Sequence, residues 1–232
     1  MKIKNLVKKT VLDTKKYSHY IFYAAKSELK SEVANSYLNG LWWILDPLMF
    51  MLVYTFVSVV IFRTTEQYFP IFVFLGLTVW NFFSKTVNQS VLIIRSYNAV
   101  ISKVYIPKYM FILQKMIVNG FKMCISLLIV FIMMIFWRVP IRLNIVLAFP
   151  ILFVLLLFTF GISCIVAHFG VYVEDLSNLV SIALNLTFYI SGIFYSIEKR
   201  IPEPLGSLIL RLNPTSLIIN EIRKVILYSQ KP

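Results

Sequence analysis

The sequence predicts an all-helical integral membrane protein with several spans, and three observations carry this prediction. Hydrophobic residues make up 59% of the chain. Two runs, 144–173 and 176–197, contain no Asp, Glu, Lys or Arg. A helix needs about 20 apolar residues to cross the hydrocarbon core of a bilayer, and these runs lack the polar face of a helix in a soluble protein. Continuous apolar runs also argue against a β-barrel, whose strands alternate.

The expected spans are separated by short connections without a Gly/Ser-rich linker or a block of charge. Five spans are predicted, at about 42–62, 70–94, 110–137, 145–173 and 176–197. Residues 42–232 are therefore expected to form one transmembrane domain, behind an amphipathic segment at 1–41. Cys124 and Cys164 both lie inside apolar runs, where free cysteine behaves as a small buried hydrophobe.

Basic residues predict the orientation of the chain in the membrane. Eleven Lys and Arg residues, eight of them lysines in 1–41, flank the spans on one side, and six flank them on the other. Because the richer side stays in the cytoplasm, the N-terminus is expected to be cytoplasmic. The net charge of +13 does not indicate a nucleic-acid partner, because the lysines crowd the ends of apolar runs, where anionic lipid head groups would meet them.

The N-terminal segment has an apolar face. Tyr17, Tyr20, Ile21 and Ala24 fall on one side of a helix, with lysines spread around it. This pattern favours a helix on the cytoplasmic membrane surface. The alternative is a basic leader that only enforces orientation.

The C-terminal segment 213–228 predicts a short amphipathic helix. Asn213 followed by Pro214 is a strong helix start, with a capping side chain and a proline at the first helical position. Three charges at Glu221, Arg223 and Lys224 would cost roughly 8–10 kcal/mol inside a bilayer if none were paired. The helix is therefore expected on the outer surface, or as a short re-entrant element.

We interpret this segment as a gate at the outer end of a transport path. The predicted gate residues are Asn213, Pro214, Glu221 and Arg223. A sixth span is expected to follow Pro232 and to return the chain to the cytoplasm.

The second span carries a polar face. Asn81, Ser84, Lys85 and Asn88 are spaced by three and four residues and share one side of a helix. Polar groups within a span normally turn toward protein or water. Two interpretations stay open: this half of the span emerges early into the cytoplasm, or the face lines a polar path.

Two further segments are candidates for contacts on the cytoplasmic side. The loop 96–110 is basic and free of acids and could bind an energy-supplying partner, or serve only as an orientation signal. Its candidate contact residues are Asn98, Lys103, Tyr105, Pro107 and Lys108. The acidic turn Glu174–Asp175 stands just before the fifth span, where it could cap that helix or form an ion pair with a cytoplasmic loop.

The chain shows no motif of a catalytic or nucleotide-binding site. No Gly-rich phosphate loop is present, so any ATP and Mg²⁺ are expected on another subunit. His19 and His168 are isolated, which gives no metal site.

Most aromatic residues near the ends of spans are expected to be interface anchors. Phe188, Tyr189 and Tyr195 lie closer together in the sequence than interface anchoring requires. With Trp42, they are candidates to contact sugar rings along a path, although helix packing explains them nearly as well.

A series of short motifs resembles the polysaccharide-export permeases of ATP-binding-cassette exporters, which transport O-antigen, teichoic acid and capsule-like polymers. The motifs cover roughly residues 17–228 in order: Glu28–Ser31, Tyr37–Trp42, Leu45–Leu48, Val53–Tyr54, Phe69–Pro70, Gly76–Leu77, Trp80–Phe83, Asn98–Lys108, Glu174–Leu176, Tyr189–Tyr195 and Asn213–Thr215. The chain departs from the pattern at Glu174, where an arginine is usual, and at Asp46, where an asparagine is common.

The resemblance implies a transport subunit rather than an enzyme. In such exporters two permease copies bind two ATPase subunits, through the N-terminal helix and the first cytoplasmic loop. ATP-driven closure of the ATPases would pass a polyprenyl-pyrophosphate-linked glycan outward across the cytoplasmic membrane. Three other functions stay open on the sequence alone: an exporter of drugs or lipids, a membrane-embedded transferase that makes lipid-linked sugars, and an ion-coupled transporter.

Overall fold

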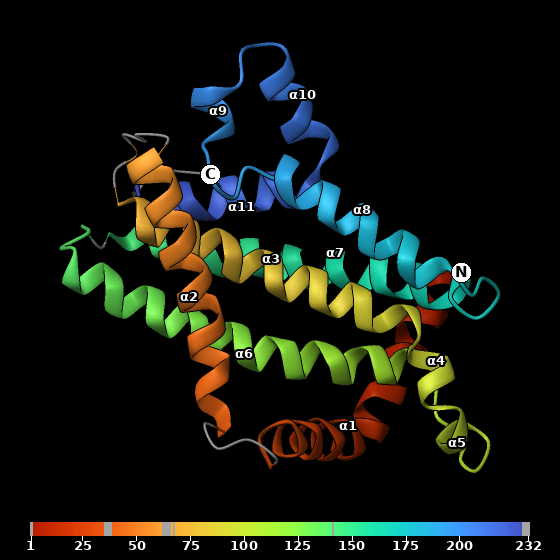
Figure 1. Ribbon diagram of the computed structural model, residues 1–232. Coiled ribbons are helices and arrows are strands. Elements are labelled where there is room, and N and C mark those ends of the chain that lie inside the picture. Colours follow the sequence, from red (N-terminus) through yellow and green to blue (C-terminus); the bar gives the residue numbers. More distant parts are fainter. Residues whose placement is uncertain (1, 35–38, 62–65, 67, 141, 229–232) are drawn as a thin grey trace.

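The computed structural model describes residues 2–34, 39–61, 66, 68–140 and 142–228, and in these ranges every regular element is a helix (Figure 1). The α-helices are α1 (Lys2–Ala34), α2 (Trp42–Phe56), α3 (Phe69–Val91), α4 (Ile93–Ser96), α5 (Asn98–Ile101), α6 (Tyr109–Phe136), α7 (Ala148–Phe169), α8 (Leu176–Ile190), α9 (Ile197–Arg200), α10 (Leu205–Leu212) and α11 (Pro214–Ile226). A 3₁₀ turn precedes α2 (Asn39–Leu41) and another precedes α7 (Leu143–Leu147), and a π-helical turn extends α2 (Val57–Ile61). The predicted all-helical membrane class is confirmed.

Four helical stretches are long and apolar enough to cross a membrane. They are Trp42–Val60, Phe69–Val91, Tyr109–Phe136 and Leu143–Phe169. Each lies within a few residues of a predicted span, because continuous hydropathy is a local property of the chain. The predicted last residue of the first span, Phe62, lies outside the described residues.

The fifth apolar run is divided by a turn that the sequence analysis did not predict. Helix α8 is 15 residues long, or about 22 Å at 1.5 Å per residue. It ends at Ile190, and Gly192 then adopts a left-handed conformation with φ of 67°. A side chain at Gly192 would collide with Ile197. The predicted boundary at residue 197 is therefore wrong, because a run without charges does not reveal a turn within it.

Helix α3 lies at the centre of the bundle and contacts α2, α6, α7, α8 and α11 (Figure 1). From Phe69 to Trp80 almost every side chain is buried, and Phe72, Phe74 and Leu75 are among the most completely buried side chains of the described chain. Its second half is more polar and more open, with Lys85 and Asn88 exposed. One helix thus supplies both a packed core and a polar wall.

Helix α1 packs against α6 with the face that the sequence predicted. Ile21 is 3% exposed, and the ring of Tyr20 lies 6.4 Å from that of Phe111 in an edge-to-face arrangement. Lys115 on α6 pairs with Glu28 of α1, and Lys122 pairs with Glu32 at 2.6 Å. These pairs tie the amphipathic helix to the bundle. The arrangement favours a packed helix over a simple basic leader.

Helix α11 begins as predicted. The side chain of Asn213 accepts hydrogen bonds from the backbone N–H groups of Thr215 (3.1 Å) and Ser216 (3.3 Å), and Pro214 occupies the first turn. The helix spans 13 residues, about 20 Å, which is too short to cross a bilayer about 30 Å thick.

Helix α11 is packed into the bundle and does not lie free on its surface. It contacts α3 and α7 and buries eight of its residues, among them Ile219, Ile222 and Arg223. The surface expectation assumed that the three charges have no partners, and the structure shows that Arg223 and Lys224 both have them. The packing therefore favours the re-entrant alternative.

Candidate functional site

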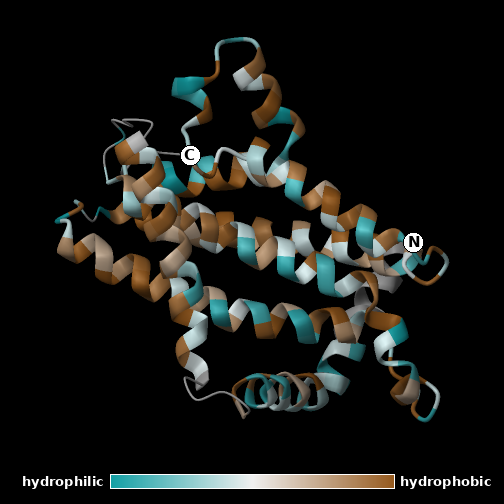
Figure 2. Ribbon diagram, viewed as in Figure 1, coloured by the Kyte–Doolittle hydropathy of each residue, from teal (hydrophilic) through white to brown (hydrophobic). Residues whose placement is uncertain are grey.

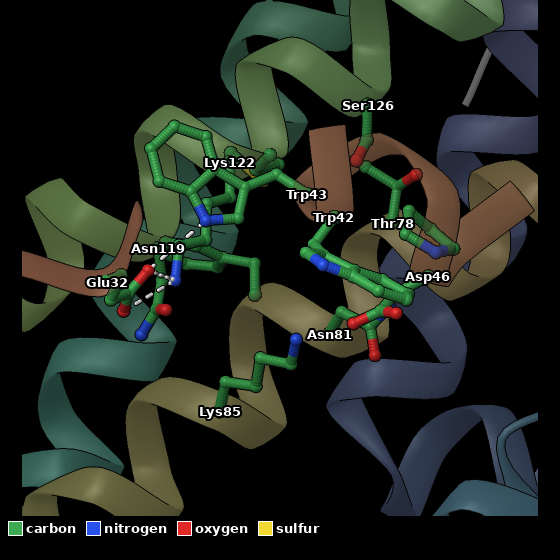
Figure 3. Close-up of a pocket in the computed structure, with 13 residues that line it drawn as sticks. Glu32, Trp42, Trp43, Asp46, Thr78, Asn81, Lys85, Asn119, Lys122 and Ser126 are labelled. Carbon is green, nitrogen blue, oxygen red and sulfur yellow. Dashed lines mark hydrogen bonds and ion pairs between the residues drawn. The ribbon is translucent and has the colours of Figure 1, made fainter. Parts of the chain in front are cut away.

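A polar cavity of about 260 Å³ lies where α1, α2, α3 and α6 meet (Figure 3). Its wall combines charged, amide, hydroxyl and indole groups. It is lined by Glu32, Trp42, Trp43, Asp46, Pro47, Thr78, Asn81, Phe82, Lys85, Asn119, Lys122, Met123 and Ser126. Figure 2 shows hydrophilic positions, in teal, interrupting the hydrophobic stretches of α3 and α6.

A second, more open space of about 500 Å³ lies farther along α3, between α3 and α8. Lys85 lines both spaces. Asn88 lines the second space and donates a hydrogen bond to Ser181 of α8 at 3.1 Å. The structure thus places Asn81, Lys85 and Asn88 along one hollowed polar face. This placement favours the interpretation that the face lines a path.

A third, aromatic cavity of about 390 Å³ lies at the other end of α8, beside the end of α2. Tyr189 and Tyr195 line it, together with Tyr54 and Phe194. The hydroxyl of Tyr195 donates to the carbonyl of Tyr189 at 3.0 Å. These two tyrosines therefore lie at a cavity wall, as the path interpretation expects.

Phe188 has a different environment from the two tyrosines. Its ring lies 5.6 Å from that of Trp80 and 5.2 Å from that of Phe194. Phe188 is not among the residues that line the aromatic cavity. Its role in the described chain is packing between α3 and α8, the alternative that the sequence analysis left open.

The candidate contact loop lies at the end of the bundle where α3 ends and α6 begins (Figure 1). Asn98, Lys103, Tyr105 and Lys108 are exposed, and Tyr105 is 82% exposed. Pro107 is partly buried, next to buried Ile106. The hydroxyl of Tyr17 on α1 donates to the carbonyl of Tyr105 at 3.1 Å. The loop thus presents its side chains outward while α1 holds its backbone.

The acidic turn faces this loop segment. Glu174 forms a long ion pair with Arg95 of α4 (4.0 Å), and Arg95 also donates to the carbonyl of Val171 at 3.2 Å. Asp175 is the N-cap residue of α8, but its side chain accepts no capping hydrogen bond. Glu174 thus contacts α4, directly before the loop, and the side chain of Asp175 does not cap α8.

Arg223 is the most constrained of the predicted gate residues. Its guanidinium group donates to three backbone carbonyls, those of Phe72 (3.1 Å), Gly192 (2.7 Å) and Ile193 (2.8 Å). Its central carbon also lies 3.5 Å from the centre of the Phe72 ring. A buried cation needs such compensation for lost hydration. Arg223 therefore ties the turn after α8 to α3 and α11.

The other charges of this segment lie in a small network with α9. Lys224 pairs with Glu198 at 2.8 Å and with Glu221 at 3.1 Å. Burial alone would raise the pKa of the Glu198 carboxyl, but hydrogen bonds from Lys224 and Asn220, and the charges of Lys224 and Lys199, hold this pKa below its usual value. Glu221 thus has a local structural partner.

Sequence reasoning missed the polar residues of α6. Lys115, Asn119 and Lys122 lie on one helical face, and all three face α1 or α3. Their spacing of four and three residues is a signal that could have revealed this face, as could the spacing of four between Glu28 and Glu32.

Comparison with known proteins places the chain in a family. Residues 19–227 match the family model described as ABC-2 type transporter. The chain is 29% identical over 199 residues to the O-antigen export system permease protein RfbA of Myxococcus xanthus, which covers 85% of this chain and 76% of the relative. It is 25% identical over 193 residues to the protein of the same name from Klebsiella pneumoniae, covering 83% of this chain and 74% of the relative.

These matches agree with the helical architecture and with the order of the sequence motifs. The family match spans α2 to α11 and α1 from residue 19 onward, so it includes every cavity described above. The chain belongs to the ABC-2 type transporter family.

Proposed function

We propose that this chain is the membrane-spanning subunit of an ATP-driven exporter that moves a lipid-linked polysaccharide across the cytoplasmic membrane. The observation that carries the proposal is the polar face of α3, which lines two neighbouring cavities that share Lys85. Ionisable groups inside a membrane domain mark substrate paths more often than structural contacts. The printed names of the relatives, O-antigen export system permease proteins, supply the substrate class.

The lining chemistry of the path fits a glycan. The cavities offer amides at Asn81 and Asn88 and tyrosines at the far end of α8. Sugars need hydrogen-bonding groups for their hydroxyls and flat aromatic faces for their C–H groups, whereas a lipid or drug exporter would favour mainly apolar walls. An anionic lipid pyrophosphate would be attracted to basic side chains at the cytoplasmic interface.

The energy would come from a separate ATPase that binds ATP and Mg²⁺. Two ATPase copies would act on two copies of this chain. We infer that they contact the exposed loop with Asn98, Lys103, Tyr105, Pro107 and Lys108, and the nearby α1. Helix α1 is held to that loop by Tyr17 and to α6 by two ion pairs, so a push on the loop would be transmitted to the helices that wall the cavity.

The orientation follows from the same assignment. The end of the bundle with α4 and α5 would face the cytoplasm, together with the N-terminus and Glu174. The segment from α9 to α11 would then lie toward the outside and gate the exit, with Asn213 and Pro214 starting the re-entrant helix and Arg223 fixing it to α3.

The decisive experiment is reconstituted transport. The chain and its partner ATPase are placed in vesicles that carry the lipid-linked polysaccharide of the source strain on the ATPase side. Addition of ATP should make the glycan accessible to a lectin on the opposite side, and an ATPase variant that binds but does not hydrolyse ATP should abolish this signal. ATP-driven movement of dyes or phospholipids without movement of the glycan would refute the substrate assignment.

A further inference from the structure

The four charged residues of the polar cavity are balanced in number. Glu32 and Asp46 oppose Lys85 and Lys122, so the formal net charge of the lining is zero. Glu32 and Lys122 neutralise each other directly at 2.6 Å. An anion-binding site would need an excess of positive charge. The cavity is therefore poorly suited to a phosphate group.

Three polar groups at the cavity wall have unused hydrogen-bonding capacity among the described residues. Lys85 and Asp46 have no hydrogen-bond or ion-pair partner in the described chain, and neither has the side-chain amide of Asn81. In Figure 3, Lys85 extends between Asp46 and Trp42 on one side and Glu32 and Asn119 on the other. Unpaired charges at membrane depth are costly unless a ligand or water meets them.

Asn119 also lines the cavity, and its neighbours fix the orientation of its side-chain amide, whose oxygen is buried. Its amide nitrogen donates to Thr86 and to Gln89, both at 3.0 Å. The hydroxyl of Thr86 donates to the carbonyl of Phe82, so it must accept from Asn119. The side chain of Asn119 is 3% exposed, and its oxygen has no partner. A buried acceptor without a donor costs about 1–3 kcal/mol.

A sugar hydroxyl group fits the side chains of Asp46, Asn81 and Lys85 better than a phosphate group does. It donates to a carboxylate or an amide oxygen and accepts from an ammonium group at the same time. A phosphate can only accept, and it would be repelled by Asp46. The indole of Trp42 supplies a flat apolar face at the same wall (Figure 3), on which the C–H face of a sugar ring can pack.

We propose that this cavity binds one uncharged sugar unit of the transported glycan, against Trp42 and between Asp46, Asn81 and Lys85, and that the lipid pyrophosphate binds elsewhere. The inference rests on the proposed function and deepens it. In this proposal Asp46 and Lys85 together bind sugar hydroxyl groups, and Lys85 does not bind a phosphate group. The wild-type charge balance is then required for sugar binding.

Binding is measured on the complex of the full chain with its ATPase, without nucleotide, by tryptophan fluorescence. The two probes are the glycan of the source strain, released from its lipid pyrophosphate by mild acid, and inorganic pyrophosphate. The glycan should bind with nearly equal affinity at about 0.05 M and about 0.5 M salt, because screening acts on charge–charge attraction. Pyrophosphate should leave glycan binding unchanged.

Variants locate the site. Asn81→Ala and Asp46→Asn should each weaken glycan binding about five- to tenfold, the loss of one or two hydrogen bonds. Asn178→Ala, an exposed amide on α8 outside the cavity, is the matched control and should bind as the wild type does. Only complexes that elute as one species, in the same yield as the wild-type complex, are compared. Lys85→Gln serves as a further variant if one of the first two does not assemble.

The outcomes separate the inference from the proposed function. Wild-type glycan affinity in all cavity variants, or displacement of the glycan by pyrophosphate, overturns the sugar site while ATP-driven glycan export remains intact. Failure of the wild-type complex to bind or export any glycan overturns both.

Discussion

Gly76 on α3 and Arg223 on α11 form a complementary pair. A Cβ atom at Gly76 would overlap with the guanidinium group of Arg223. The absence of a side chain at Gly76 lets Arg223 reach the carbonyls of Phe72, Gly192 and Ile193. Since these carbonyls belong to α3 and to the turn after α8, one arginine connects three parts of the bundle.

The first prediction tests this pair. Gly76→Ala should destabilise the protein by about 1–3 kcal/mol, as overpacking of a filled interior does. Arg223→Lys should cost about 1.5–3 kcal/mol for each charged hydrogen bond lost, because an ammonium group lacks the planar fork that meets three carbonyls. The measurement is the melting temperature of the purified protein in detergent.

The control for this prediction is Gly161→Ala on α7, where an added Cβ meets no atom within 4 Å. It should melt at or above the wild-type temperature, since alanine favours the helix. Equal melting temperatures for Gly76→Ala and Gly161→Ala would show that Arg223 is not confined as described.

The second prediction concerns the ion pair between α1 and α6. Glu28→Leu should lower stability, because it leaves Lys115 partly buried without its carboxylate. The double variant Glu28→Leu with Lys115→Leu should recover part of the loss, since an apolar pair of similar volume is often neutral in such a place, while buried Gln114 still lacks the acceptor that Glu28 provides. A double-mutant cycle on thermal melting measures the coupling, and a double variant as unstable as the sum of the two single variants would contradict it.

The third prediction concerns the exposed loop. Tyr105→Ala together with Pro107→Ala should lower ATP-driven export severalfold at unchanged membrane abundance, because the side chain of Tyr105 is 82% exposed and that of Pro107 is only partly buried. Tyr172→Ala is the control, an exposed tyrosine at the same end of the bundle that lies outside this loop. Export by the double variant at the wild-type rate would remove the loop from the coupling mechanism.

The fourth prediction concerns orientation. In a chain with Cys124 and Cys164 replaced, a cysteine at Ser102 should react with a membrane-impermeant thiol reagent only after the membrane is opened. A cysteine at Glu203, which is exposed between α9 and α10, should react in intact cells. The reversed pattern would mean that the excess of Lys and Arg was assigned to the wrong side.

The helical membrane class, the approximate extent of four spans and the start of α11 at Asn213 could all be predicted from the sequence. These features depend on residues that are close together in the sequence, so hydropathy and helix-capping preferences predict them. The polar face of α3 was visible for the same reason, because its spacing is local.

Contacts between residues far apart in the chain could not be predicted in this way, because they depend on how the helices pack. Gln114 and Glu28, 86 residues apart, hydrogen-bond across α6 and α1, and Arg223 bonds to Phe72, 151 residues away. The charges of α11 could not be placed from the sequence, because burial of Arg223 depends on distant carbonyls and on the space that Gly76 leaves. The cavity around Lys85 arises in the same way: four helices each contribute a polar residue, and only their packing brings these residues to one wall.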